Sequence, residues 1–167
     1  MKDDSLNAWL LYLKLSYFRE CHQSQAQEAA QKNRSHLDFL SRLVEGETLR
    51  RKDRATKRRV QAARFPIVKT LEQFNWSWPK KINRPQVQHL FGLAFLKDKG
   101  NVIFMGGVGL GKTHLAISLA HEACLAGHTV LFTTAIDIIN TLAAAQSANR
   151  LKSELKKYLS PVILLVD

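Results

Sequence analysis

The chain has 167 residues, 46% of them hydrophobic, which suits one packed domain or a small appendage joined to part of a larger one. A formal net charge of +11 points to an acidic partner, and nucleic acid is favoured over an anionic membrane because no lipidation motif or amphipathic tail is found. Two distant cysteines without metal-ligand spacing and a start unlike a signal peptide favour a cytoplasmic protein with reduced thiols and no membrane association.

Most of the charge lies in the first 100 residues, which hold 20 Lys and Arg against 10 Asp and Glu. Apolar residues at steps of three and four predict an amphipathic helix over 6–20, and residues 21–34 are expected to be largely helical. The sequence Ser35-His36-Leu37-Asp38 has the form of a capping box. It predicts a helix from there to about Ala63, with Gly46 as its weak point.

Residues 65–82 read as an aromatic linker, because Phe65-Pro66 ends the preceding helix. We expect Phe74, Trp76 and Trp78 to pack against the following domain, with stacking on a nucleic-acid base as the alternative. Asn83 is a suitable cap for a helix that is expected to end near residues 99–100.

The remaining sequence alternates between short apolar runs and helical patterns. Strands are predicted at 101–105, 129–133 and 162–166, and helices at 112–126, 135–146 and 149–159. This order favours a parallel α/β sheet. We therefore expect a helical DNA-binding and assembly region over 1–64, the linker over 65–82, and an α/β domain over 83–167.

A phosphate-binding pattern, G-x-x-x-x-G-K-[ST], is matched by Gly106, Gly111, Lys112 and Thr113. Its glycines let backbone N–H groups turn toward phosphate oxygens, Lys112 would reach the β and γ phosphates, and Thr113 would bind Mg²⁺. ATP is the expected ligand. The expected nucleotide contacts are Gly106, Gly107, Val108, Gly109, Leu110, Gly111, Lys112, Thr113 and His114, although a packing role for His114 is equally open.

Asp167 follows the last apolar run, some 50 residues after the loop, as the acid of a Walker B strand does. It is expected to hold Mg²⁺ through water, and a solvated acid at the end of a buried strand is the alternative. Hydrolysis also needs a group that activates the attacking water, often a Glu directly after this Asp. The sequence ends at Asp167, so ATPase activity stays open.

Residues 50–64 are strongly basic and contain only one acid, Asp53. A helix with this charge can follow a phosphate backbone with little sequence specificity, and a solvated helix face is the alternative. The candidate DNA contacts are Arg50, Arg51, Arg54, Lys57, Arg58 and Arg59.

Several runs together resemble the IstB-like helper ATPases of bacterial insertion sequences, which are AAA+ proteins related to the DnaC helicase loader. The runs are residues 35–40, the basic helix, and the segments 63–74, 111–116 and 130–135. The resemblance covers about residues 6–167, and the loop departs from the family at Gly107-Val108, where proline is common. It implies ATP-bound oligomers on double-stranded DNA that assist a transposase, with Lys112 and Thr113 as Walker A residues and Asp167 as the first Walker B acid.

The family continues beyond this point with a second acid, a sensor strand, an arginine finger and a helical lid. Its next strand lies between the P-loop strand and the Walker B strand. We therefore expect a helical region followed by a partial AAA+ parallel sheet, incomplete at its C-terminus, in a truncated copy. The alternatives are a DnaC-like helicase loader, a non-hydrolysing DNA-binding remnant, and a small-molecule kinase.

Overall fold

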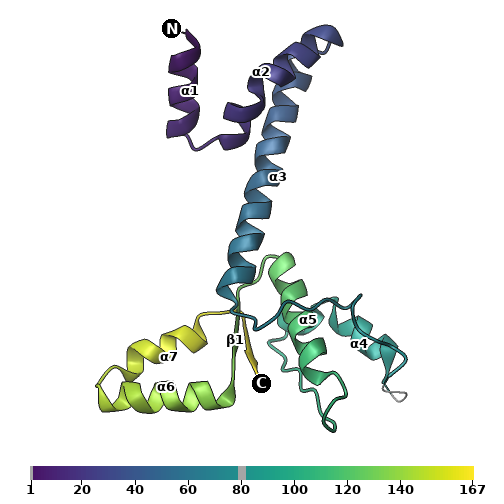
Figure 1. Ribbon diagram of the computed structural model, residues 1–167, viewed down its shortest axis with the longest axis vertical. Coiled ribbons are helices and arrows are strands. Elements are labelled where there is room, and N and C mark those ends of the chain that lie inside the picture. The colour runs from purple at the N-terminus through teal and green to yellow at the C-terminus, as the bar shows by residue number, and fades with distance from the viewer. Residues whose placement is uncertain (1, 79–81) are drawn as a thin grey trace. The chain divides into compact units, whose positions relative to one another are not determined.

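A computed structural model describes residues 2–78 and 82–167 and divides the chain into two compact units, Met1–Ala55 and Thr56–Asp167 (Figure 1). The first contains α1 (Lys2–Tyr12), α2 (Ser16–Gln31) and most of α3 (His36–Ala62). The elements of the second, after the end of α3, are α4 (Arg84–Leu90), the 3-10 helix η1 (Ala94–Leu96), α5 (Lys112–Leu125), β1 (Val130–Thr133), α6 (Ala135–Ser147), α7 (Leu151–Leu159) and β2 (Ile163–Val166). None of the helices described is long and apolar enough to cross a membrane.

The expected fold class is confirmed, because helices lead into a P-loop region with a small parallel sheet. The single helix predicted over 6–20 is wrong, since the chain turns between α1 and α2. Lys14 adopts a left-handed φ of 56°, and the N–H groups of Lys14 and Leu15 donate to the carbonyls of Leu11 and Leu10. This is a Schellman motif without glycine, so the sequence carried no signal for it.

Helix α3 begins where the capping box predicts, and the N–H of Asp38 donates to Ser35 Oγ at 3.1 Å. Gly46 is not a weak point of this helix. A Cβ at that position would fall within the ring of Tyr17 from α2, so the missing side chain lets the two helices pack closely.

Glu47 is a buried acid of the first unit, only 4% exposed. Its carboxylate accepts the backbone N–H of Tyr17 at 2.7 Å and the Nε–H of Arg51 at 2.9 Å. It thereby caps the start of α2, where Leu15 has no side chain able to do so. Burial raises the pKa of Glu47, but the bonds from Arg51 and the α2 backbone outweigh it and hold that pKa below its usual value.

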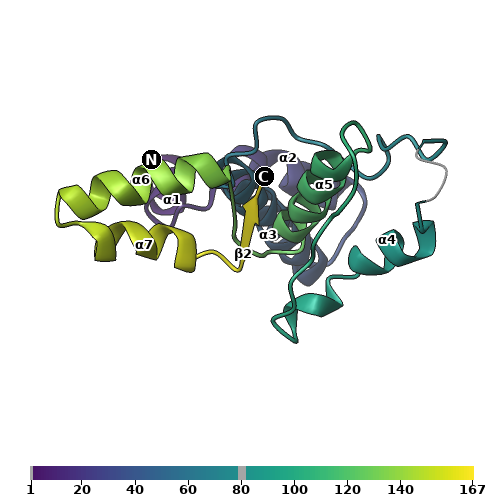
Figure 2. The same ribbon diagram turned by 90° about the horizontal axis from the view of Figure 1, so that it is seen from below.

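The second unit is built around a parallel sheet in which β1 pairs with β2, from Val130 opposite Ile163 to Thr133 opposite Val166. Helix α5 packs on the sheet through a buried cluster that includes Ala123 and Cys124. Burial raises the pKa of the Cys124 thiol, and neither described cysteine is in a disulfide. Helices α6 and α7 lie side by side and connect the two strands (Figure 2).

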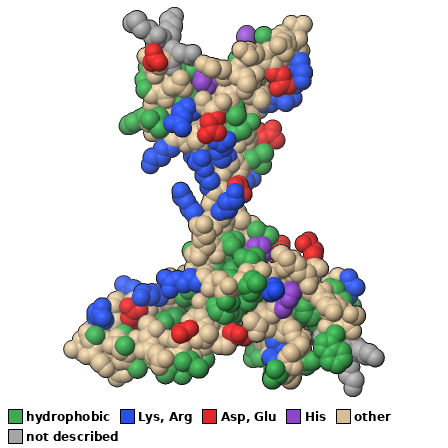
Figure 3. All heavy atoms as spheres, viewed as in Figure 1, with side chains coloured by type: hydrophobic (Ala, Val, Ile, Leu, Met, Phe, Trp, Pro, Cys, Tyr) green, Lys and Arg blue, Asp and Glu red, His purple; other side chains and the backbone are tan. Residues whose placement is uncertain are grey.

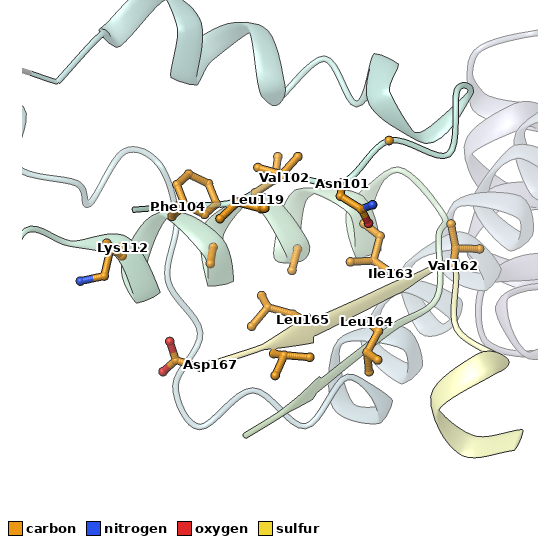
Figure 4. A pocket seen from close by; sticks show the side chains of 15 residues that line it. Asn101, Val102, Phe104, Lys112, Leu119, Val162, Ile163, Leu164, Leu165 and Asp167 are labelled. Atoms are coloured by element: carbon orange, nitrogen blue, oxygen red, sulfur yellow. The ribbon is translucent and has the colours of Figure 1, made fainter. Parts of the chain in front are cut away.

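The strand predicted at 101–105 is wrong, because no strand is assigned there and Ile103 and Met105 are largely exposed. A cavity of 390 Å³ separates this segment from β2 (Figure 4). Apolar side chains of the segment, α5 and β2 line it, among them Val102, Phe104 and Leu119. A strand exists only as part of a hydrogen-bonded ladder, and the cavity lies where the family resemblance leads us to expect a further strand.

Helix α4 starts as predicted, with Asn83 Oδ1 accepting the N–H of Gln86 at 3.1 Å. It ends at Leu90, more than two turns before the predicted end near residues 99–100. Leu93 adopts a left-handed φ of 56°, which separates α4 from the short helix η1.

Replacing Glu47 by Gln should destabilise the first unit at neutral pH by about 1–3 kcal/mol, because a charge-assisted buried cap is lost. The contribution of an acid with a depressed pKa is present above its unfolded pKa of about 4.3 and is lost as the pH falls through its folded pKa. The difference between wild type and Glu47→Gln should therefore shrink below about pH 4.

Urea unfolding followed by circular dichroism between pH 3 and pH 7 measures this difference. Glu45→Gln is the matched control, since Glu45 is exposed two residues away on the same helix. Equal losses for the two variants at pH 7 would contradict the capping role of Glu47.

Candidate nucleotide-binding site

The glycine-rich loop connects the 101–105 segment to α5 and is open to solvent, with Val108 fully exposed. Gly109 and Gly111 have φ values of 77° and 83°, a left-handed conformation that strains residues with a Cβ. No atom outside the adjacent residues lies within 4 Å of the position that a Cβ would take at Gly109. The backbone at Gly109 is therefore open to a ligand.

Lys112 and Thr113 form the first turn of α5, directly after the loop. The Lys112 ammonium donates to the carbonyl of Gly107 at 2.7 Å, so its charge lies over the loop. The unpaired N–H groups at the start of a 14-residue helix add positive potential at the same place. This arrangement favours a phosphate group.

Asp167 lies beside this turn although 54 residues separate it from Thr113. The Thr113 hydroxyl donates to Asp167 Oδ1 at 2.9 Å. Two backbone bonds hold Asp167 in place: its N–H donates to the carbonyl of Thr133, and its carbonyl accepts the N–H of Ala135. Figure 4 shows Lys112 and Asp167 at the same end of the cavity beside β2.

The paired hydroxyl and carboxylate fit Mg²⁺, which takes oxygen ligands and keeps several waters when it binds with nucleotide phosphates. Within the described ranges no group of three or more His, Cys, Asp and Glu side chains could hold a metal ion. A magnesium site at Thr113 and Asp167 would thus depend on phosphate and water oxygens for its other ligands.

His114 points away from the loop toward the linker. Its Nε2 lies 3.0 Å from the carbonyl oxygen of Thr70, and its ring meets that of Phe74 edge-on at 5.4 Å. Phe74 is buried, whereas Trp78 is 58% exposed. The expected packing of the linker therefore holds for Phe74. Sequence reasoning missed its contact with the loop, since nothing in the pattern links residues 70–74 to residues 111–114.

Arg50, Arg51 and Arg59 have partners within the protein. Arg50 donates to Glu20 at 2.6 Å and lies over the ring of Tyr17 at 5.2 Å. Arg51 pairs with the buried Glu47. Arg59 donates to the carbonyl of Cys124 at 2.9 Å, which ties the end of α3 to α5. These three side chains have structural contacts that the charge pattern did not indicate.

Arg54 and Arg58 are exposed and have neither an ion pair nor a side-chain hydrogen bond within the described part of the chain, and Lys57 is exposed too. Lys and Arg side chains gather along the middle of α3 in Figure 3. Positions 54 and 58 are one helical turn apart and share a face. Both side chains are therefore open to a polyanion.

Comparison with known proteins places these features in a family. The profile of the family described as IstB-like ATP binding protein matches residues 8–167. The chain is 38% identical over 162 residues to a protein of Pseudomonas aeruginosa named as an ATP-binding protein of insertion sequence IS21, covering 97% of this chain and 61% of that protein.

Two further relatives carry similar names. An IS5376 ATP-binding protein of Geobacillus stearothermophilus is 32% identical over 155 residues, which are 93% of this chain and 62% of the relative. An insertion-sequence ATP-binding protein of Mycobacterium tuberculosis is 30% identical over 165 residues, which are 99% of this chain and 66% of the relative. The chain thus spans 61–66% of the length of these relatives. The profile match extends over nearly the whole sequence, and the chain belongs to the family of IstB-like ATP-binding proteins.

Proposed function

We propose that this chain binds ATP with Mg²⁺ and serves as the ATP-binding helper of a bacterial insertion sequence. The contact between Thr113 and Asp167 carries the nucleotide part of the proposal. It joins a hydroxyl from the phosphate-loop helix to a carboxylate at the end of β2, and these are the two protein groups that a nucleotide-bound magnesium ion needs.

The roles within the site follow from its chemistry. The loop from Gly106 to Gly111 would surround the phosphates with N–H groups, and Lys112 would exchange the Gly107 carbonyl for a phosphate oxygen. Thr113 would bind Mg²⁺ directly and Asp167 through water. The bound ion would neutralise phosphate charge that the protein alone leaves uncompensated.

The biological setting is inferred from the relatives, which are named as ATP-binding proteins of insertion sequences. We propose a transposase and double-stranded DNA as the partners, and assembly of several copies on DNA when ATP is bound, in the bacterial cytoplasm. The family resemblance of the loop, the basic helix and the 63–74 segment supports this setting.

We propose that DNA lies against the open basic face of α3. Arg54 and Arg58 supply its charge, with the exposed Lys57 on a flanking face. Arg50, Arg51 and Arg59 support that face by fixing the helix rather than by binding phosphate. Contacts of this kind neutralise phosphates and read no bases, so the affinity should be strongly salt-dependent and nearly independent of DNA sequence.

Replacing Lys112 by Ala should weaken ATP binding by about 10- to 100-fold, because hydrogen bonds to charged groups contribute about 1.5–3 kcal/mol. Binding of double-stranded DNA by α3 should stay unchanged. Isothermal titration with MgATP and fluorescence anisotropy with labelled DNA measure the two affinities. Lys152→Ala, at an exposed lysine on α7, is the control. If DNA affinity fell with ATP affinity, the division of labour would be wrong.

Replacing Asp167 by Asn should remove most of the advantage that Mg²⁺ gives to ATP binding, since a neutral amide holds the water shell of the ion less well. The measurement compares ATP affinity in magnesium and in EDTA. In the wild type magnesium should tighten binding, and in Asp167→Asn the two affinities should converge. Asp98→Asn, at an exposed acid, should behave as wild type. A full magnesium effect in Asp167→Asn would rule out its metal role.

The double variant Arg54→Ala/Arg58→Ala should bind DNA more weakly and reduce the slope of log affinity against log salt by about 2, because each lost phosphate contact removes about 0.9. Its melting temperature should stay near that of wild type, whereas Arg50→Ala should lower it. Lys97→Ala/Lys99→Ala makes the same change in net charge at two exposed lysines outside α3. An equal loss of slope in that control would show that net charge, not this face, governs binding.

A further inference from the structure

Phe74 of the linker lies directly against Gly111, the last residue of the loop. A Cβ at Gly111 would be 2.6 Å from Cε2 and 3.3 Å from Cζ of the Phe74 ring, far inside contact distance. Gly111 is also the residue that precedes α5, with a φ of 83°. The ring therefore touches the backbone at the point where the loop becomes a helix.

A second contact lies three residues further along the chain, at His114, after Lys112 and Thr113. The ring of His114 meets Phe74 edge-on, with centroids 5.4 Å apart and planes at 83°. His114 Nε2 is also 3.0 Å from the carbonyl oxygen of Thr70. Lys112 and Thr113 thus lie between two residues, Gly111 and His114, that Phe74 contacts.

The Phe74 ring is itself held by side chains of the linker, α4 and α5. It is 6% exposed and forms a buried cluster with Val87 of α4 and Leu115 of α5. Trp76 packs edge-on against it, with centroids 5.0 Å apart, and the guanidinium of Arg84 lies 4.8 Å above the Trp76 ring. The Phe74 side chain therefore couples the position of the linker to that of the loop.

We propose that Phe74 is a positioning residue for ATP binding: it holds the Gly111 turn and the first turn of α5 in place, and it couples the linker to the nucleotide site. This inference rests on the proposed ATP binding. Glycine has wide backbone freedom, and the Phe74 ring limits that freedom at Gly111. In a variant that lacks this ring, the loop would lose more conformational entropy when it binds a nucleotide. Trp76 contacts the same ring. The environment of Trp76 therefore changes when nucleotide fills the site.

The first arm of the test uses no nucleotide. Hydrogen–deuterium exchange of the 106–115 amides is measured in the full chain for wild type, Phe74→Ala and Phe74→Leu. Phe74→Ala should speed exchange in this segment, and Phe74→Leu, which still fills most of the space, should restore it. Val130→Ala, in the separate buried cluster around Ala123, weakens the core of the same unit without touching the loop. It should leave exchange at 106–115 as in wild type.

The second arm measures MgATP affinity by isothermal titration in the same four proteins. Phe74→Ala should bind about tenfold more weakly, since displacing positioned groups by about 1 Å costs up to a hundredfold in enzymes. Phe74→Leu should bind within about twofold of wild type. In a Trp9→Phe/Trp78→Phe background, ATP should change Trp76 emission, and Phe74→Ala should abolish that change even at saturating ATP.

The outcomes separate the two proposals. If wild type binds MgATP and Phe74→Ala matches Val130→Ala in exchange at 106–115 and wild type in affinity, Phe74 has no positioning role. The same conclusion follows if Phe74→Leu fails as fully as Phe74→Ala while both remain folded by circular dichroism. If wild type binds no MgATP but Phe74→Ala still speeds exchange at 106–115, the ATP-binding proposal fails and the hold of Phe74 on the loop stands.

Discussion

The parallel pairing of β2 with β1 is the interaction on which the site depends. Parallel strands direct their carboxyl ends to one edge of a sheet, and α5 packs across both strands, so its first turn comes to the same edge. Asp167 reaches Thr113 only because the ladder continues one residue beyond β2, through its bond to the Thr133 carbonyl. The glycine loop supplies the anion-binding backbone, but without this pairing the hydroxyl of Thr113 would have no carboxylate beside it.

The parts of the fold predicted from sequence are those that local rules determine. The Walker A pattern, the cap at Ser35, the apolar runs of β1 and β2 and the position of Asp167 all follow from short-range composition, and their elements form where expected. The turn at Lys14 was missed because a non-glycine residue takes the left-handed conformation there. The strand predicted at 101–105 does not form, for a different reason: its sequence suits a strand, but strand formation requires a hydrogen-bonded neighbour.

The basic helix shows how charge alone overstates a binding surface. Arg50, Arg51 and Arg59 satisfy acids, carbonyls or an aromatic ring inside their own unit, and only the structure reveals those partners. Arg51 illustrates the consequence, because its bond to Glu47 stabilises a carboxylate that in turn caps α2. Part of the positive charge is therefore needed to keep a buried acid ionised, and the surface that can meet a polyanion is narrower than the sequence suggests.

The cavity beside β2 has a consequence for how the chain behaves in solution. The N–H groups of Ile163 and Asp167 point toward β1, so those of Leu164 and Val166 point toward the cavity. On the outer side of β1, the N–H of Phe132 already donates to the Ala63 carbonyl. β2, in contrast, has no second partner strand among the described residues. Such an open strand invites pairing with another polypeptide. Self-association that rises with protein concentration but ignores ATP and DNA would therefore reflect strand pairing between copies, not the assembly of a helper protein on its target.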